Sequence, residues 1–126
     1  MEDEIIMDKH TVMGMEGTIA NMGAIVIDGP LNEKRGYHKL FIFCNGYGIS
    51  VRRSYSSYAT PGKMDFEVAG IKHYYSGILG HFDYNLEYSG SFKDDVIGYA
   101  VPERVAELAR EVGSRAADKN ADEEVD

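Results

Sequence analysis

The sequence predicts an α+β domain: an antiparallel β-meander of about four to six strands with one C-terminal amphipathic helix packed on a face. Two patterns lead to this prediction. Between residues 37 and 71, runs of β-branched and aromatic residues alternate with turn signals, as in consecutive antiparallel strands. After residue 101, apolar residues recur every three or four positions, as on one side of a helix.

The first part of the chain predicts two short strands. The apolar triple Ile5-Ile6-Met7 indicates a strand over residues 4–9. The β-branched run at residues 23–27 indicates a second strand, and Asp28-Gly29-Pro30 ends it because these residues favour a turn. From Val12 to Ile27 the pattern is looser, with glycines at positions 14, 17 and 23.

The strongest strand prediction covers residues 37–44, where four consecutive apolar residues from Leu40 suit a central strand covered on both sides. Asn45-Gly46 supplies the two residues with positive φ that a type I′ hairpin requires, so residues 47–54 return as the partner strand. Residues 64–71 alternate between apolar and acidic side chains, which predicts a third strand.

The remaining elements are a further strand and a helix. Residues 72–80 are ambiguous, residues 82–89 indicate a strand and residues 90–95 a turn. The helix is expected to begin at Pro102, because a first helical position needs no N–H donor, and to end near Ala116. Its apolar stripe consists of Val101, Val105, Leu108, Ala109 and Val112.

Length and charge favour one domain with acidic ends. A chain of 126 residues can bury its own core, so we expect a single domain over residues 1–117 and a disordered acidic tail over residues 118–126. The net charge is −8, yet residues 5–115 carry 13 acids against 12 bases. This distribution favours solvated tails over a DNA-mimicking surface, and bulk charge gives no attraction to nucleic acid.

Several observations favour a cytoplasmic location and no membrane association. No apolar run reaches the roughly 18 residues that a membrane span needs. The N-terminus is acidic where a secretory signal would be basic. Cys44 is the only cysteine, which excludes an internal disulfide, and its apolar surroundings predict a buried inert thiol.

Four motifs in the chain resemble a family of small accessory proteins of tailed bacteriophages. The matching residues are Tyr47, Gly48, Ser50 and Val51; Ser57, Tyr58 and Gly62; Phe66, Glu67, Val68 and Ala69; and Asp95, Val96, Ile97, Gly98 and Tyr99. The resemblance covers roughly the C-terminal two thirds of the chain, and residues 1–36 do not contribute. Ala59 replaces an expected glycine, and the connection at residues 72–82 is longer than usual.

The resemblance implies a phage or prophage origin and a β-meander with a C-terminal helix, and it carries no established activity. Small phage accessory proteins of this kind often bind and inhibit host machinery, including defence systems. The resemblance therefore implies a phage-encoded protein that inhibits or modulates a host protein in the host cytoplasm. Counter-defence (anti-CRISPR-like) inhibition by occlusion is one form of this function.

The candidate partner-binding residues are an arginine pair and the tyrosines near it: Arg52, Arg53, Tyr47, Tyr55 and Tyr58. Such residues could clamp a phosphate and stack a base, although adjacent strand residues face opposite sides. A structural role explains the same pattern: one arginine would pair with Asp65 or Glu67 across the hairpin. Tyrosine and arginine also dominate protein–protein hot spots. We predict a protein-binding loop over residues 54–63, with a binder that sequesters a nucleotide or phosphorylated signal as the alternative.

Other chemistry finds little support in the sequence. His73, His81 and Asp83 do not follow a zinc-ligand pattern, and no serine lies in a G-x-S-x-G elbow. We therefore predict no metal, no cofactor and no enzymatic activity. The nearby aromatic residues are expected in a sheet or a recognition patch: Tyr74, Tyr75, Phe82, Tyr84 and Tyr88. An exposed edge in so small a sheet favours a homodimer.

Overall fold

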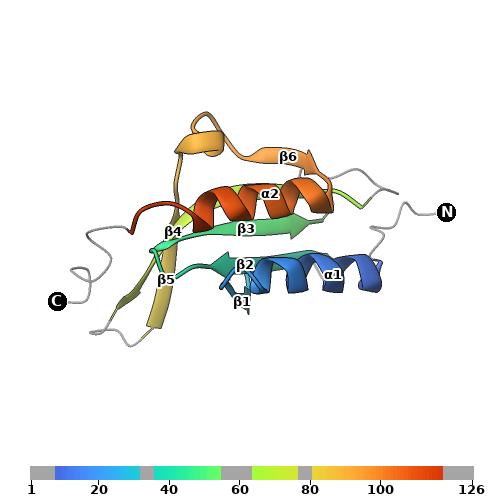
Figure 1. The fold of residues 1–126 in the computed structure, drawn as a ribbon, viewed down its shortest axis with the longest axis horizontal. Coiled ribbons are helices and arrows are strands. Elements are labelled where there is room, and N and C mark those ends of the chain that lie inside the picture. Colours follow the sequence, from blue (N-terminus) through green and yellow to red (C-terminus); the bar gives the residue numbers. More distant parts are fainter. Residues whose placement is uncertain (1–7, 32–35, 55–63, 77–80, 118–126) are drawn as a thin grey trace.

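A computed structural model describes residues 8–31, 36–54, 64–76 and 81–117 of the chain. The elements run in the order α1 (Lys9–Ala20), β1 (Ile25–Asp28), β2 (Tyr37–Ile42), β3 (Tyr47–Arg53), β4 (Phe66–Ser76), β5 (His81–Leu86), η1 (Gly90–Phe92), β6 (Ile97–Ala100) and α2 (Pro102–Gly113). The described strands form one antiparallel sheet in the order β1-β2-β3-β4-β5, and β6 also pairs with β4. The predicted α+β meander with a C-terminal helix is confirmed (Figure 1).

Strand β4 pairs with two different strands along its outer edge. Its first residues pair with β6, whereas its residues from Ile71 onward pair with β5. On its other side, β3 reaches no further than Lys72. Among the described strands, the end of β4 from His73 to Ser76 therefore pairs with β5 alone. The two strands extend together away from the helices as a two-stranded ribbon (Figure 1).

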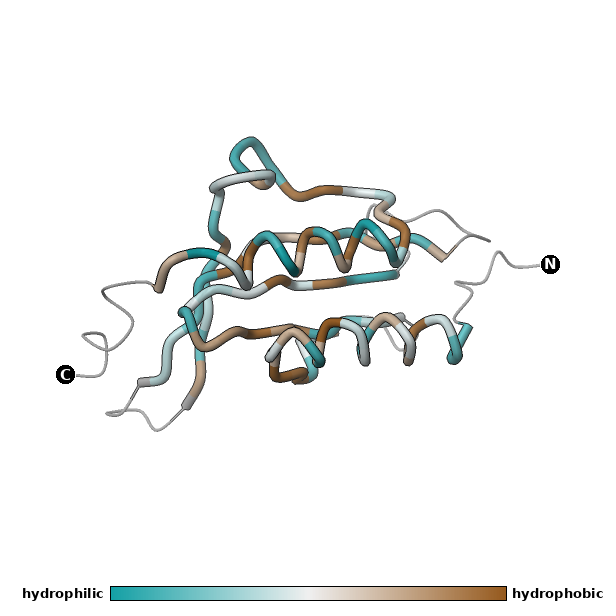
Figure 2. The backbone as a smooth tube through the Cα atoms, viewed as in Figure 1, coloured by the Kyte–Doolittle hydropathy of each residue, from teal (hydrophilic) through white to brown (hydrophobic). Residues whose placement is uncertain are grey.

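Both helices cover the same face of the sheet and enclose the core. α1 packs beside β1 and against α2, while α2 lies over β3 and β4 (Figure 1). The core lies between the helix layer and the sheet and combines apolar residues of both: Val12, Met15 and Ile19 from α1, Phe41, Ile49, Val51, Phe66 and Val68 from the sheet, and Val105, Leu108, Ala109 and Val112 from α2. Along α2, polar and apolar residues alternate from turn to turn (Figure 2). The predicted stripe is confirmed except at Val101, which precedes the helix and is 49% exposed.

Helix α1 corrects the prediction for the N-terminal part of the chain. The predicted strand over residues 4–9 is wrong at its end, because Lys9 begins a helix; residues 4–7 lie outside the described residues. Asp8 caps this helix through Oδ1, which accepts hydrogen bonds from the backbone N–H groups of His10 and Thr11. Val12, Met15 and Ile19 are its only buried positions, so its apolar side is narrow.

The turn between β2 and β3 differs from the predicted type I′ hairpin. Gly46 has φ +92°, but Asn45 is not among the residues with positive φ. The N–H of Gly46 donates to Phe43 O, which makes Cys44 and Asn45 the central residues of a turn that a left-handed glycine follows. The Asn45 amide is buried and donates to Val112 O at the end of α2 (2.9 Å). Cys44 is exposed at this turn, so the prediction of a buried thiol is wrong.

The predicted C-terminal strand and helix are present with shorter ends: β5 ends at Leu86 where residues 82–89 were predicted, and α2 ends at Gly113 where the prediction reached Ala116. The ambiguous residues 72–76 extend β4, and β6 was not predicted as a strand. Residues 118–126, predicted as an acidic tail, lie outside the described part of the chain. No helix that the structure describes has the length and apolar character of a membrane span.

Candidate functional site

Arg53 lies inside the fold and is not part of a contact surface. Its side chain is fully buried, and Nη1 donates to the backbone oxygen (2.6 Å) and to Oδ1 (3.2 Å) of Asp65. Desolvation lowers the pKa of Arg53, and the nearby Asp65 carboxylate opposes this shift. The predicted role of Arg53 as an exposed partner contact is therefore wrong, because its strand position faces the helix side of the sheet. The alternative of an Arg–Asp65 pair is confirmed.

Of the three predicted tyrosines, only Tyr47 lies in the part of the chain that the structure describes, and it does not share a contact surface with the arginines. Tyr47 is half-buried against the core, and the Arg115 guanidinium lies 5.2 Å from its ring centroid. This cation–π contact joins β3 to the end of α2, so Tyr47 belongs to the scaffold. Tyr55 and Tyr58 lie outside the described residues, as does the loop from residue 55 to 63.

Arg52 lies on the opposite face of the sheet, which we call the open face because neither α1 nor α2 covers it. Strand register places two rows of residues side by side there: His38, Arg52 and Glu67 in one row, and Leu40, Ser50 and Ala69 in the next. A cavity of about 150 Å³ lies over these rows, with Tyr84, Leu86 and Val96 as further lining residues. We call it the His38–Ser50 cavity.

The two residues that name this cavity form a hydrogen-bonded pair. His38 Nδ1 is 2.6 Å from Pro30 O, and His38 Nε2 is 2.7 Å from Ser50 Oγ. A carbonyl oxygen can only accept, so Nδ1 carries the proton and the neutral ring accepts the Ser50 hydroxyl proton at Nε2. Desolvation lowers the pKa of His38, which favours this neutral form. Both residues are 6% exposed.

The charged groups of the cavity are Arg52 and Glu67. Within the described residues, Arg52 Nε is a buried side-chain nitrogen without a hydrogen-bond partner. The Glu67 side chain lines the same cavity, so the lining carries one group of each charge. A volume of about 150 Å³ is also small for a nucleotide, since pockets for such ligands usually measure about 300–1,000 Å³. The cavity suits a neutral group with a hydrogen-bond acceptor.

The ribbon formed by β4 and β5 carries a second candidate site, which we call the aromatic ribbon (residues 73–76 and 81–84). Register places four rings on its open-face side: His73, Tyr75, Phe82 and Tyr84. The His73 and Phe82 centroids are 5.8 Å apart, and those of Phe82 and Tyr84 are 6.2 Å apart. On the other side, Tyr74 Oη donates to Asp83 (3.4 Å). Tyr75 is 54% exposed, so the predicted aromatic patch is partly open to solvent.

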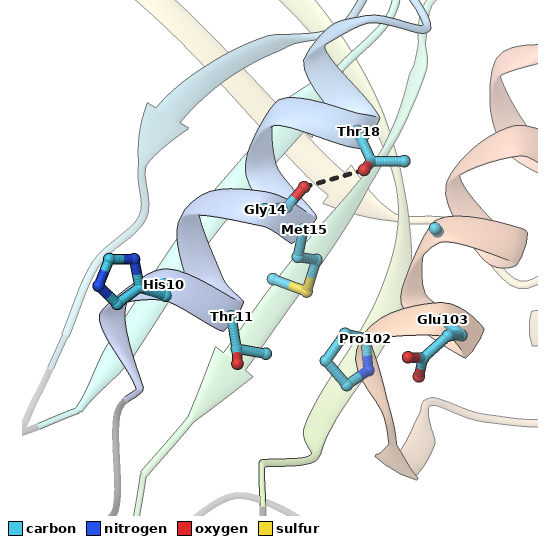
Figure 3. A pocket seen from close by; sticks show the side chains of 8 residues that line it. His10, Thr11, Gly14, Met15, Thr18, Pro102 and Glu103 are labelled. Carbon is cyan, nitrogen blue, oxygen red and sulfur yellow. Dashed lines mark hydrogen bonds between the residues drawn. The ribbon is translucent and has the colours of Figure 1, made fainter.

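A groove between the helices is the third concave feature. It measures about 350 Å³ and is lined mainly by small side chains of α1 and the first turn of α2: His10, Thr11, Gly14, Met15, Thr18, Pro102, Glu103 and Ala106 (Figure 3). The Thr18 hydroxyl donates a hydrogen bond to Gly14 O within the helix, so it is not directed at a ligand in the groove (Figure 3). The groove brings no set of reactive groups together.

The histidines and acids of the described residues do not assemble into a metal-binding group of three. His73 Nε2 lies 2.7 Å from Phe43 O, which fixes this ring at the base of the aromatic ribbon.

Comparisons with protein-family models, with curated proteins and with solved structures found no match for this chain. The resemblance to phage accessory proteins stays a prediction that depends on its motifs.

His38 and Ser50 are the site residues that the sequence did not reveal. They are 12 positions apart, and only the β2–β3 register brings their side chains together. The available signal was that Ser50 lies between two apolar strand residues, Ile49 and Val51. A polar residue at such a position is usually buried with a partner.

Proposed function

We propose that the protein binds another protein through the aromatic ribbon and thereby blocks the surface that it covers. The observation that carries this proposal is the projecting pair of strands with four rings on one side, of which Tyr75 is 54% exposed. Aromatic residues, tyrosine above all, are enriched in protein–protein interfaces because they bury a large area and lose little conformational entropy. A two-stranded ribbon is only marginally stable alone, so a partner that covers its rings would stabilise it.

Occlusion follows from the shape of this surface. The ribbon extends beyond the helix-covered sheet, so it can enter a groove on a partner without a clash with α1 or α2 (Figure 1). The resemblance to phage accessory proteins supports a host protein as the partner and inhibition as the outcome. A second copy of the chain is the competing partner, because the outer edge of β5 has no described neighbour.

The test compares two tyrosines of equal exposure. Tyr75 and Tyr88 are both 54% exposed, but Tyr88 follows β5 and lies outside the aromatic ribbon. Tagged wild-type protein and the variants Tyr75→Ala and Tyr88→Ala are used to capture partners from bacterial lysate, and the captured proteins are quantified by mass spectrometry. We expect Tyr75→Ala to weaken capture by about tenfold or more, as for an interface hot spot, and Tyr88→Ala to have no effect.

Two results would contradict the proposal. One is equal capture by wild-type protein and Tyr75→Ala with unchanged melting curves. The other is sedimentation of the pure protein as a dimer whose dissociation is enhanced by Tyr75→Ala, since a second copy would then occupy the ribbon.

A further inference from the structure

We propose that Ser50 is a reactive nucleophile that His38 activates, and that it takes the acyl group of small neutral esters bound in the His38–Ser50 cavity. This activity goes beyond partner binding and uses the part of the open face next to the aromatic ribbon, with Tyr84 common to both sites. It depends on the hydrogen-bonded pair, on the cavity next to it and on the buried Nε of Arg52, a residue that lines the cavity.

The hydrogen bonds fix the direction of proton transfer. Pro30 O holds the proton on Nδ1 of His38, so the lone pair of Nε2 points at the Ser50 hydroxyl, 2.7 Å away. A nucleophilic serine needs this arrangement: a base within hydrogen-bond reach and a third group that orients the base. Here a backbone carbonyl takes the orienting role that a carboxylate has in a Ser-His-Asp triad.

The neighbouring residues leave room for a substrate and offer it a donor. Ala69 lies directly across from Ser50 in the β3–β4 register, and its small side chain leaves space over the hydroxyl. Arg52 follows two positions along the same strand on the same face, about 7 Å further on, and its Nε is buried without a described partner. This N–H can donate to a carbonyl oxygen that becomes negatively charged during attack.

Cavity size and lining define the class of substrate. An engineered apolar cavity of about 150 Å³ holds benzene, so the His38–Ser50 cavity accepts an acyl group of about that size. Tyr84, Leu86 and Val96 provide apolar walls, which suit a short hydrocarbon chain. The lining carries one group of each charge, Arg52 and Glu67, so a neutral ester suits the cavity better than a charged ligand.

The chemical step balances with the ester and water alone. Ser50 Oγ attacks the carbonyl carbon while its proton passes to His38 Nε2, and the bond from that carbon to the alcohol oxygen breaks. The leaving alkoxide takes the proton from Nε2 and departs as an alcohol. Water then attacks the acyl-serine, gives a proton to Nε2 and releases the carboxylic acid, and the proton returns to Ser50 Oγ.

A fluorophosphonate probe tests the nucleophile directly in the full chain. We expect one covalent adduct per molecule, located on Ser50 by peptide mass spectrometry, and loss of that adduct in Ser50→Ala. Ser91→Ala is the matched control, because Ser91 also donates its hydroxyl to a side chain, that of Glu111, but has no histidine partner. Prior incubation with 4-nitrophenyl butyrate should slow labelling, since its acyl group is no larger than benzene.

Two further measurements distinguish activation of Ser50 by His38 from labelling of a serine that is merely accessible to the probe. His38→Gln should slow labelling about 10²-fold, as expected for loss of a general base, with a folded circular-dichroism spectrum. If this variant does not fold, the pH dependence of labelling in the wild-type protein decides. The charged groups near His38 are Arg52 and Glu67, with opposite effects on its pKa, and desolvation lowers that pKa below 6.5. Labelling should therefore be constant above pH 7 and fall under acidic conditions.

The proposal is overturned if Ser50 carries no adduct, if the adduct forms on other serines alone, or if its rate depends on neither His38 nor pH. None of these results affects the proposed partner binding, because labelling needs no partner.

Discussion

Removal of one member of the buried Arg53–Asp65 pair should destabilise the protein strongly. The perturbation is Arg53→Met, which keeps much of the side-chain volume and removes the charge. Arg53 is fully buried and the Asp65 side chain is 6% exposed, so neither charge is well solvated by water. At 3.2 Å, the attraction between two unit charges is about 5 kcal/mol with an effective dielectric constant of about 20.

The expected cost of the single change is about 3–5 kcal/mol, because it removes the Arg53 charge from beside the buried Asp65 carboxylate. The whole domain has a stability of about 5–15 kcal/mol, so this loss is a large fraction of the total. The double variant Arg53→Met/Asp65→Ala should lose less than the sum of the two single variants, since no uncompensated charge remains. Arg104→Met is the control: its ion pair with Glu107 is exposed and should contribute less than about 1 kcal/mol.

The assay is urea denaturation followed by circular dichroism, with all variants compared at similar m values. The reasoning is refuted if Arg53→Met unfolds within about 1 kcal/mol of the wild-type protein, a change typical of surface substitutions. It is also refuted if the double variant loses the full sum of the single losses, because the two side chains would then act independently.

Two further predictions concern the core and the open face. Leu108→Ala should lower the free energy of unfolding by about 2–5 kcal/mol, because this side chain is fully buried. Val101→Ala, at a 49% exposed position, should change it by less than about 1 kcal/mol. Equal losses for the two variants in denaturant titrations would contradict the packing of α2 in the core. For His38, desolvation lowers the pKa in the folded state, so the unfolded state binds more protons below pH 6.5. The stability from this group is thus present above the unfolded-state pKa of 6.5 and is lost as the pH falls from there through the lower pKa of the folded state. Thermal melts from pH 5 to pH 8 should show this fall in the wild-type protein and a smaller one in His38→Gln. Identical pH profiles of the two proteins would contradict it.

The sequence predicts the elements whose pattern is strong and local. A continuous apolar run in residues 37–44 defines β2, alternation in residues 47–54 and 64–71 defines β3 and the start of β4, and the stripe after Pro102 defines α2. The pattern of α1 is weak because glycines interrupt it and only one narrow side is buried. Its capping residue, Asp8, was the available signal.

The site residues depend on information that the sequence does not contain. Strand alternation correctly separates Arg52 from Arg53, but the position of the helices decides which of the two is buried. The partners on neighbouring strands depend on register, which the residues of the β2–β3 turn fix. Asn45 illustrates this dependence, because its amide donates to α2, 67 positions later in the chain.

The exposed thiol of Cys44 has a practical consequence for work on this protein. The turn that holds Cys44 contacts the base of the aromatic ribbon. The backbone N–H of His73 donates to Gly46 O (2.9 Å), and Nε2 of the His73 ring lies within hydrogen-bond distance of Phe43 O. The sequence contains no other cysteine, so a maleimide fluorophore would attach at this single point. Its emission would report when a ligand arrives at the neighbouring strands, without any engineered substitution.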